Sequence, residues 1–250
     1  MELLEWDARS YDELPLPHRR WGADLIAGLR LAGDETALDL GCGTGRDAQR
    51  LLARLPRGRV IAVDGSRRML DRLRSRLGWA GDRLIVLHAD LREPMRLPEP
   101  VDVALSVATL HWLPDHDTVF RGVGRALRPG GRFVAEAGGR GNVAGVLRAI
   151  AEVTGRDVGH AARFWNFAGV DETVARLRRA GFTDVRVELV PDPARLERGD
   201  QLEAFLGTVV LGAHLAELPV EQRRPFVAAI ADRLPEPVVD YVRLRIDAVR

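Results

Sequence analysis

The chain contains no lysine, because all 37 of its basic residues are arginine. A chain without lysine can supply neither a Schiff-base lysine nor the lysine of a phosphate-binding P-loop, so both kinds of site are excluded. The single cysteine, Cys42, excludes an intramolecular disulfide and a thiolate-rich zinc site. We therefore expect no metal ion at the functional site.

Long apolar runs are missing as well. No run approaches the roughly 18 residues of a membrane-spanning helix, and the start, MELLEWDARS, lacks the basic region and apolar core of a signal peptide. The formal net charge is +1 and the arginines are spread over predicted helices, so no strong field points to nucleic acid or an acidic membrane. We expect a cytoplasmic protein without a nucleic-acid or membrane partner.

Short apolar runs alternate with stretches of helical spacing, and this alternation predicts right-handed β-α-β units. The first five runs lack a strict apolar-polar alternation, which predicts strands covered on both faces, whereas the last run alternates. The runs lie at 36–40, 59–64, 83–90, 101–107, 131–138, 182–190 and 239–250. The sequence therefore predicts a Rossmann-like α/β fold with a mostly parallel sheet and helices on both faces.

The stretch LDLGCGTGRDAQ (38–49) places three glycines between the first strand and the next helix. Open α/β sheets bind ligands at the carboxyl ends of their strands, and glycine lets the backbone approach a ligand closely. A dinucleotide fingerprint needs a small residue at the sixth position from Gly41, where this chain has Arg46. The spacing therefore disfavours a nicotinamide cofactor, although a nicotinamide-dependent oxidoreductase is kept as an alternative.

Five motifs follow one another over residues 36–138: ALDLGCGTG, VIAVDGS, LHADLRE, VDVALSVATLHWLPD and LRPGGRF. In these motifs the chain resembles the class I S-adenosylmethionine-dependent methyltransferases. More loosely, WDARSYD, LHWLPDH and the helical region at 200–234 resemble the trans-aconitate methyltransferase group. The resemblance implies S-adenosyl-L-methionine as cofactor, S-adenosyl-L-homocysteine as its product, and a seven-stranded sheet with an antiparallel last strand and helical lid insertions.

The resemblance also implies transfer of a methyl group to a small-molecule acceptor, at a carboxylate or hydroxyl oxygen. No Asn/Asp-Pro-Pro-Tyr/Phe tetrapeptide and no Pro-Cys pair follow the fourth strand, which argues against methylation of nucleic-acid bases. A non-catalytic regulator that binds S-adenosylmethionine is a further alternative. The sequence leaves open whether the protein is a monomer or a homodimer.

We expect one methyltransferase domain over residues 1–250. It would comprise an N-terminal lid arm at 1–33, a cofactor-binding core at 34–138, and a C-terminal part at 139–250 with a helical insertion at 191–239.

The resemblance assigns the cofactor contacts to residues near the ends of the strands. Asp64 would accept both ribose hydroxyls, Asp90 would accept the adenine amino group, and Ser106 would face the methyl group. A lone carboxylate such as Asp39 is more often a helix cap or turn residue, so its assignment depends on the shared strand ends. The complete set is Asp39, Gly41, Cys42, Gly43, Gly45, Asp64, Gly65, Ser66, Met69, Ala89, Asp90, Leu91, Ser106, Val107 and Tyr11.

Candidate acceptor contacts are polar and aromatic residues outside the glycine turn. They are His111, Trp112, Trp21, His18, Asn142 and Trp165. His111 is also the candidate catalytic residue, because histidine can take a proton near neutral pH. Two other interpretations of His111 stay open, namely a hydrogen bond to an acceptor carboxylate and a purely structural role.

Overall fold

The computed structural model describes residues 18–250, with side chains from Arg20 onward. The predicted cofactor contact Tyr11 therefore lies outside the described residues. His18 opens helix α2 (His18–Ala27), but its side chain also lies outside the described part of the chain.

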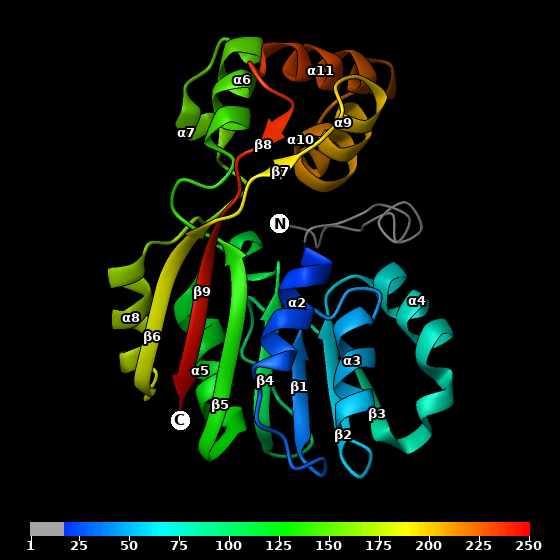
Figure 1. Ribbon diagram of the computed structural model, residues 1–250, viewed down its shortest axis with the longest axis vertical. Coiled ribbons are helices and arrows are strands. Elements are labelled where there is room, and N and C mark those ends of the chain that lie inside the picture. Colours follow the sequence, from blue (N-terminus) through cyan, green and yellow to red (C-terminus); the bar gives the residue numbers. More distant parts are fainter. Residues whose placement is uncertain (1–17) are drawn as a thin grey trace.

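Within residues 18–250, seven strands form one sheet in the order β3-β2-β1-β4-β5-β9-β6 (Figure 1). The strands are β1 (Thr36–Leu40), β2 (Arg59–Asp64), β3 (Leu84–His88), β4 (Val101–Val107), β5 (Leu127–Gly138), β6 (Thr183–Pro191) and β9 (Val242–Val249). Strands β1 to β5 pair in parallel, whereas β9 is antiparallel to both β5 and β6. The predicted Rossmann-like fold, with its antiparallel last strand, is confirmed.

The strand order reverses between β1 and β4. The chain first builds outward from β1 to β2 and β3, and then returns to place β4 on the other side of β1. At such a switch point the connections leave the sheet in opposite directions and open a crevice at the carboxyl ends of the strands. The glycine turn that follows β1 lies at this point.

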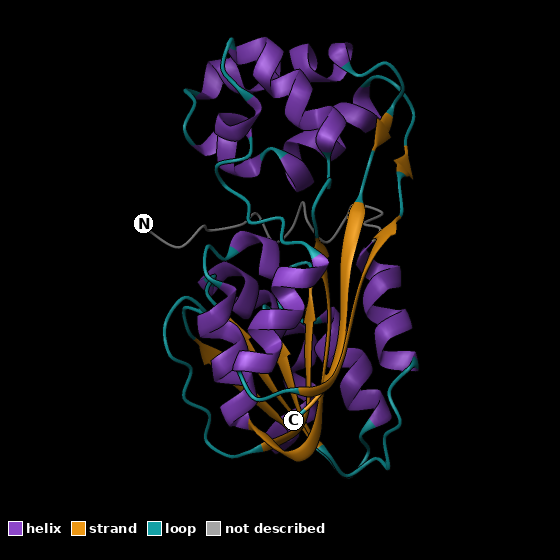
Figure 2. Ribbon diagram, turned by 90° about the vertical axis from the view of Figure 1, so that its left-hand side faces the viewer, coloured by secondary structure: helices purple, strands orange, loops and turns teal. Residues whose placement is uncertain are grey.

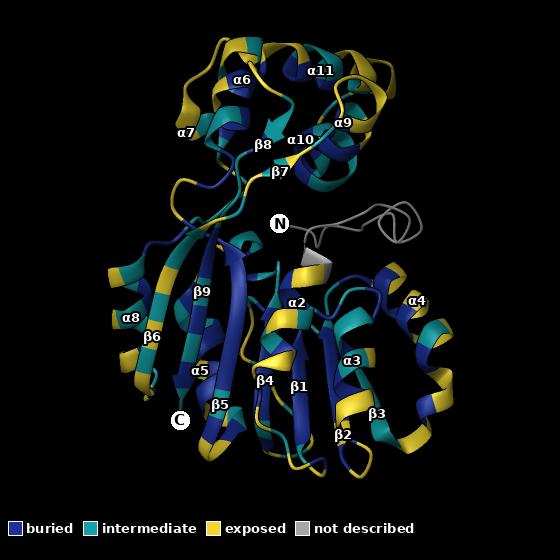
Figure 3. Cartoon of the chain, viewed as in Figure 1, coloured by how far each residue is buried: buried dark blue, intermediate teal, exposed yellow. Residues whose placement is uncertain are grey.

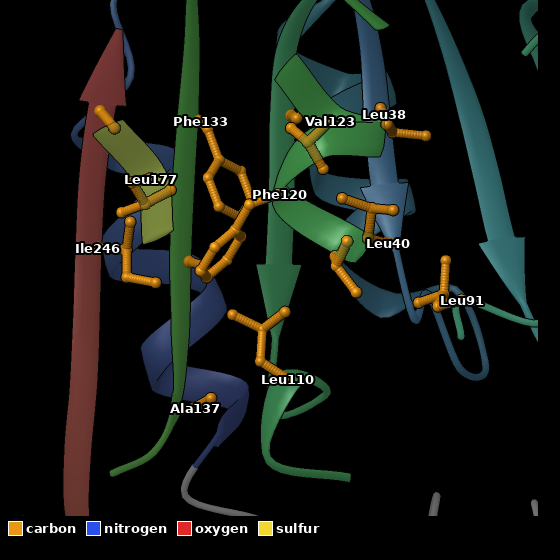
Figure 4. Packing of buried hydrophobic residues seen from close by; sticks show 14 of the residues in the cluster. Leu38, Leu40, Leu91, Leu110, Phe120, Val123, Phe133, Ala137, Leu177 and Ile246 are labelled. Carbon is orange, nitrogen blue, oxygen red and sulfur yellow. The ribbon is translucent and has the colours of Figure 1, made fainter. Parts of the chain in front are cut away.

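Helices cover both faces of the sheet, because successive strand residues point to opposite sides. Leu38 and Leu40 of β1 belong to one apolar cluster with residues of α5 (His116–Ala126) and α8 (Val170–Arg179) (Figure 4). Ala37 packs on the other face with α2, α3 (Arg46–Arg54) and α4 (Arg67–Leu77). Two short 3-10 helices also occur, η1 (Gly78–Arg83) after α4 and η2 (Leu110–Trp112) after β4. None of the described helices is long and apolar enough to cross a lipid bilayer.

A second layer of helices, which we call the cap, lies above the carboxyl ends of the strands (Figures 1 and 2). Its elements come from two segments of the chain, one after β5 and one between β6 and β9. They are α6 (Ala144–Thr154), α7 (Val158–Ala161), β7 (Ala194–Arg195), α9 (Asp200–Phe205), the π-helix η3 (Leu206–Val210), α10 (Gly212–Ala216), α11 (Val220–Arg233) and β8 (Val238–Val239).

The cap has an apolar core of its own. Leu147 and Ile150 of α6 pack with Phe205 of α9 and Ile230 of α11, apart from the two apolar clusters of the sheet. Exposed, half-buried and buried residues alternate along the cap helices α6 and α11 (Figure 3). Residues 191–239 supply most of the cap, and α6 and α7 complete it.

Candidate functional site

A cavity of about 660 Å³ lies between the carboxyl ends of the strands and the cap. Its volume is within the range of roughly 300–1,000 Å³ that is usual for small-molecule and cofactor sites. The part that we call the sheet half is lined by residues at strand ends, namely Gly41, Gly43, Asp64, Gly65, Ser66, Met69, Asp90, Leu91, Arg92, Val107 and Ala108. The part that we call the cap half is lined by Val143, Phe164, Trp165, Phe167, Val209, Val210, Ala213, Ala216 and Glu217.

The glycine turn borders the sheet half, and two of its glycines are required for different reasons. Gly41 has a φ of +71°, and a Cβ atom there would lie 2.0 Å from Oγ1 of Thr109. Gly43 has a φ of +50°, but a Cβ atom there would point into open space. Gly41 is therefore fixed by packing, whereas the bare backbone of Gly43 leaves room in the cavity.

Asp64, at the end of β2, is hydrogen-bonded to the glycine turn. One of its carboxylate oxygens accepts a hydrogen bond from the Gly43 amide at 2.8 Å, and the other accepts the Ser66 amide at 2.8 Å. Ser66 in turn caps α4, because its Oγ accepts the Met69 amide at 3.3 Å. Asp64 thereby fixes the backbone at two points beside the cavity, at Gly43 and at Ser66.

Asp39 does not line the cavity. It alternates with Leu38 and Leu40 along β1, so its side chain faces α3, where the residue is 2% exposed. Burial, followed by the nearby carboxylates of Asp47 and Asp64, raises the pKa of Asp39 well above its usual range. Its Oδ2 accepts no hydrogen bond within the described residues.

Four other predicted cofactor contacts also lie outside the cavity lining. Cys42 is buried, and burial raises the pKa of its thiol well above the ordinary value, so it is no nucleophile. A Cβ atom at Gly45 would lie 2.7 Å from Leu73, which shows that this glycine packs against α4. Ser106 donates its Oγ to the Leu40 carbonyl at 3.1 Å and so turns into the sheet. Ala89 contributes a backbone amide, which donates to the Asp64 carbonyl at 3.1 Å.

His111, in η2, lines the cavity where the sheet half meets the cap half. The Gly138 amide donates to its Nδ1 at 3.1 Å. A neutral imidazole that accepts at Nδ1 carries its proton on Nε2, so the ring offers a donor. Burial, with a smaller contribution from His116, lowers the pKa of His111 to about 3. This geometry suits a hydrogen bond to an acceptor oxygen better than removal of a proton near neutral pH.

The comparisons with known proteins agree with this arrangement. Residues 37–131 match a family described as methyltransferase domain. An uncharacterized methyltransferase of Schizosaccharomyces pombe is 30% identical over 203 residues, which cover 77% of this chain and 76% of that protein. The trans-aconitate 2-methyltransferase of Azoarcus sp. (strain BH72) is 37% identical over 126 residues, which cover 50% of this chain. The match spans about half of that relative, 48% of its length.

The chain belongs to the class I S-adenosylmethionine-dependent methyltransferases. A similar fold is found in phosphoethanolamine N-methyltransferase 2 of Haemonchus contortus, solved with phosphomonomethylethanolamine and S-adenosylhomocysteine. The two structures superpose with a TM-score of 0.62 at 19% identity, over 92% of this chain and 52% of the other. Family membership confirms the predicted cofactor class and removes the support for a nicotinamide-dependent oxidoreductase.

In this methyltransferase, Asp90 lines the cavity together with Arg92, a residue that the sequence analysis did not select. The Arg92 guanidinium donates to both carboxylate oxygens of Asp90, at 2.6 to 2.9 Å. These bonds lower the pKa of the Asp90 carboxyl below its usual value. Arg92 stands two residues after Asp90 in LHADLRE, so the sequence already places the two residues close together.

Asn142 lines the cavity from the first cap segment. Its side-chain oxygen accepts the Val242 amide at 2.9 Å, which leaves the amide nitrogen as the group available to a ligand. Val143, the next residue, has a φ of +47°, and Ala108 at the end of β4 has a φ of +55°. Such strained backbone in residues other than glycine is concentrated at functional sites.

Arg243, on β9, was missed by the sequence analysis although it lines the cavity. It forms an ion pair with the buried carboxylate of Glu136, and its Nε lies 3.4 Å from Asp192. Its guanidinium carbon lies 5.2 Å from the centroid of the Trp21 ring, which also lines the cavity. The signal was available, because an arginine in the middle of a strand that packs in a sheet needs a buried partner.

Aromatic rings continue from His111 into the cap half. The Phe167 ring lies 6.2 Å from the His111 ring, and Trp165 stacks on Phe167 at 5.5 Å with an interplanar angle of 16°. Trp112 lies 5.8 Å from Trp165. The cavity therefore brings together the predicted acceptor contacts Trp21, His111, Trp112, Asn142 and Trp165. Residues 18–250 contain no group of three or more histidine, cysteine or carboxylate side chains placed to hold a metal ion.

Proposed function

We propose that this protein transfers the methyl group of S-adenosylmethionine to an oxygen atom of a small-molecule acceptor, either a carboxylate or a hydroxyl. One observation carries the proposal: the same cavity joins the strand-end groups of the sheet half to the hydrogen-bond donors of His111 and Asn142. The name of the Azoarcus relative supports a carboxylate, because trans-aconitate is a carboxylic acid anion.

The sheet half supplies the groups that the cofactor needs. The open space at Gly43 admits a ligand beside the backbone, and Asp64, at the end of β2, would accept the ribose hydroxyls. Asp90 and the Leu91 amide would meet the adenine ring, beside Met69. Asp39 would act from beneath the turn, where a bound cationic ligand would favour the ionised form of this buried carboxyl group.

His111 and Asn142 would hold the acceptor. When bound, S-adenosylmethionine supplies an activated sulfonium methyl group, which becomes bonded to the acceptor oxygen as the carbon–sulfur bond breaks and a thioether is left. A carboxylate is already ionised near neutral pH, so His111 needs to take no proton from it. We therefore assign His111 to acceptor binding through Nε2–H rather than to general-base catalysis.

Positioning and exclusion of water are then the main contributions of the chain to the rate. The apolar cap closes the cavity above the strand ends, and orientation of two reactants is worth up to roughly 7–11 kcal/mol. Calorimetric titration with S-adenosylhomocysteine and with NADH tests the cofactor, and we expect binding of the former alone. Transfer of a labelled methyl group to a panel of carboxylates and alcohols tests the reaction. Cofactor binding with no transfer to any acceptor would favour the regulator.

A further inference from the structure

The cap half of the cavity is almost entirely apolar. Apart from Glu217, its lining consists of aromatic and aliphatic side chains from Val143, the loop after α7, η3 and α10. Glu217 is already paired, because its carboxylate lies 2.5 Å from the Arg163 guanidinium. Among residues 20–250, the wall of the cap half therefore offers an acceptor hydrophobic contact and no unpaired charge.

The two arginines that line the cavity within the described part of the chain, Arg92 and Arg243, are also paired. Arg92 is held by both carboxylate oxygens of Asp90. Arg243 faces the carboxylates of Glu136 and Asp192. A ligand with several carboxylates would lose the hydration of each one without gaining a cation for it, which is costly in a buried site. Neutral donors on His111 and Asn142 can compensate for one carboxylate, but not for three.

We infer that the acceptor is a monocarboxylate with an apolar body, either an aliphatic chain or an aromatic ring system. Its carboxylate would lie between His111 and Asn142, and its body would fill the cap half. This inference rests on the proposed methyl transfer and narrows its acceptor. It separates this chain from a relative whose named substrate, trans-aconitate, carries three carboxylates.

Two structural features of the cap half are consistent with a binding site for an apolar group. Val209 and Val210 belong to η3, a π-helical turn, and such turns are frequent at functional sites. Trp165 and Phe167 form a stacked pair on the opposite segment. Rigid aromatic walls of this kind bury large apolar areas at low entropic cost.

Calorimetric titration of the protein saturated with S-adenosylhomocysteine tests the inference. The ligands are hexanoate, octanoate, decanoate, 3-phenylpropanoate and trans-aconitate. We expect the dissociation constant to fall with chain length, by up to about fourfold for each methylene buried, and trans-aconitate to bind at least tenfold more weakly than octanoate. The comparison of decanoate with 3-phenylpropanoate distinguishes an aliphatic from an aromatic body.

Two matched variants locate the effect. Val209→Asp places a negative charge in the cap half of the cavity. Val220→Asp places the same charge on the surface of the cap, where Val220 is 73% exposed. We expect Val209→Asp to weaken octanoate binding at least tenfold and to leave the affinity for S-adenosylhomocysteine within twofold. Val220→Asp should change neither.

Three results would overturn the inference while the proposed function stands: tighter binding of trans-aconitate than of octanoate, no binding of any monocarboxylate, or equal effects of the two variants. Absence of S-adenosylhomocysteine binding to the wild-type protein would instead overturn the proposed function, and the inference with it.

Discussion

The indole nitrogen of Trp21 donates a hydrogen bond to Oδ2 of Asp192 at 2.6 Å, across 171 positions of the sequence. The same carboxylate accepts Arg20 at 2.6 and 2.7 Å, and Nε of Arg243 lies 3.4 Å from it. Asp192 stands where the chain leaves β6 for the cap, so one carboxylate ties together α2, β9 and the entrance to the cap. This contact lies directly beside the cavity.

Replacement of Asp192 should therefore destabilise the protein. Asp192→Ala removes the acceptor of the Trp21 indole and one of the two carboxylates that face the buried Arg243, and we expect a loss of about 1–3 kcal/mol in the free energy of unfolding. Arg20→Ala is the matched control, because its side chain is 63% exposed and such surface pairs contribute at most about 1 kcal/mol. Urea unfolding of both variants measures the difference, and equal losses would contradict the central role of Asp192.

Asp64→Ala should weaken cofactor binding. Charge-assisted hydrogen bonds contribute about 1.5–3 kcal/mol each, so we expect the dissociation constant of S-adenosylhomocysteine to rise at least tenfold in calorimetry. The melting temperature should also fall, because Asp64 holds the amides of Gly43 and Ser66. Asp71→Ala on α4, with a side chain 75% exposed, should leave both quantities unchanged. Unchanged affinity in Asp64→Ala would remove this residue from the cofactor site.

The two glycines of the turn should respond differently to alanine. In Gly41→Ala the new methyl group meets Thr109 in addition to the left-handed backbone, so we expect a loss of stability of about 2–5 kcal/mol. In Gly43→Ala only the backbone cost of roughly 1–2 kcal/mol applies, but the methyl group enters the cavity and should reduce the affinity for S-adenosylhomocysteine. Thermal unfolding and calorimetry separate the two effects. Similar melting temperatures for the two variants would show that the turn rearranges.

His111→Ala should raise KM for the acceptor more than it lowers kcat. Loss of a general base would lower kcat by roughly 10²–10⁴-fold and change its pH dependence, whereas loss of a binding contact mainly raises KM. Because the pKa of His111 is lowered to about 3, we expect the wild-type kcat to show no inflection near pH 6.5 from this residue. Steady-state kinetics from pH 5 to 9 measure both. An inflection near pH 6.5 that disappears in His111→Ala would restore the general base.

Acid should destabilise the protein through His214, which is buried in the cap. Its Nε2 is 2.9 Å from the Ala161 carbonyl oxygen, and burial lowers its pKa from 6.5 to about 4. In the unfolded chain, His214 takes up a proton as the pH falls through 6.5. In the folded protein, it does so only near pH 4. Stability is therefore complete above pH 6.5 and is lost as the pH falls, by up to about 1.4 kcal/mol per pH unit.

His214→Gln keeps an N–H donor for Ala161 but cannot titrate. Urea unfolding at pH 7, 6 and 5 should show a shallower loss of stability in this variant than in the wild type. His88→Gln, which replaces an exposed histidine at the end of β3, should keep the wild-type slope. An unchanged slope in His214→Gln would show that other groups cause the acid sensitivity.

The sheet and its glycine turn could be predicted from sequence because their signals are local. The strand ends that carry Gly43, Asp64 and Asp90 follow apolar runs directly, and parallel strands bring these ends to one edge. Whether the side chain of a strand-end residue faces the cavity or the packed interior was harder to predict. Asp39 and Ser106 belong to the same strand ends, yet one faces α3 and the other bonds to the Leu40 carbonyl.

The cap half could not be predicted residue by residue. Its lining comes from Val143, the loop at 164–167 and the helices at 206–216, which meet only through tertiary packing. The helical stretch QLEAFLGTVVLGAHLAEL also divides into α9, η3 and α10, because Gly207 and Gly212 weaken a continuous helix. Arg243 depends on Glu136 and Asp192, two partners that are far away in sequence.

The separate apolar core of the cap has a consequence for the evolution of such proteins. Substitutions that reshape the cap half of the cavity alter packing within the cap. The packing beneath the glycine turn is unaffected, because distant sites contribute independently to stability. Selection can therefore change which molecule is methylated without rebuilding the machinery that supplies the methyl group. We expect related chains with different acceptor specificities to differ most in sequence between 143 and 170 and between 194 and 239, and to share the cofactor-binding sheet.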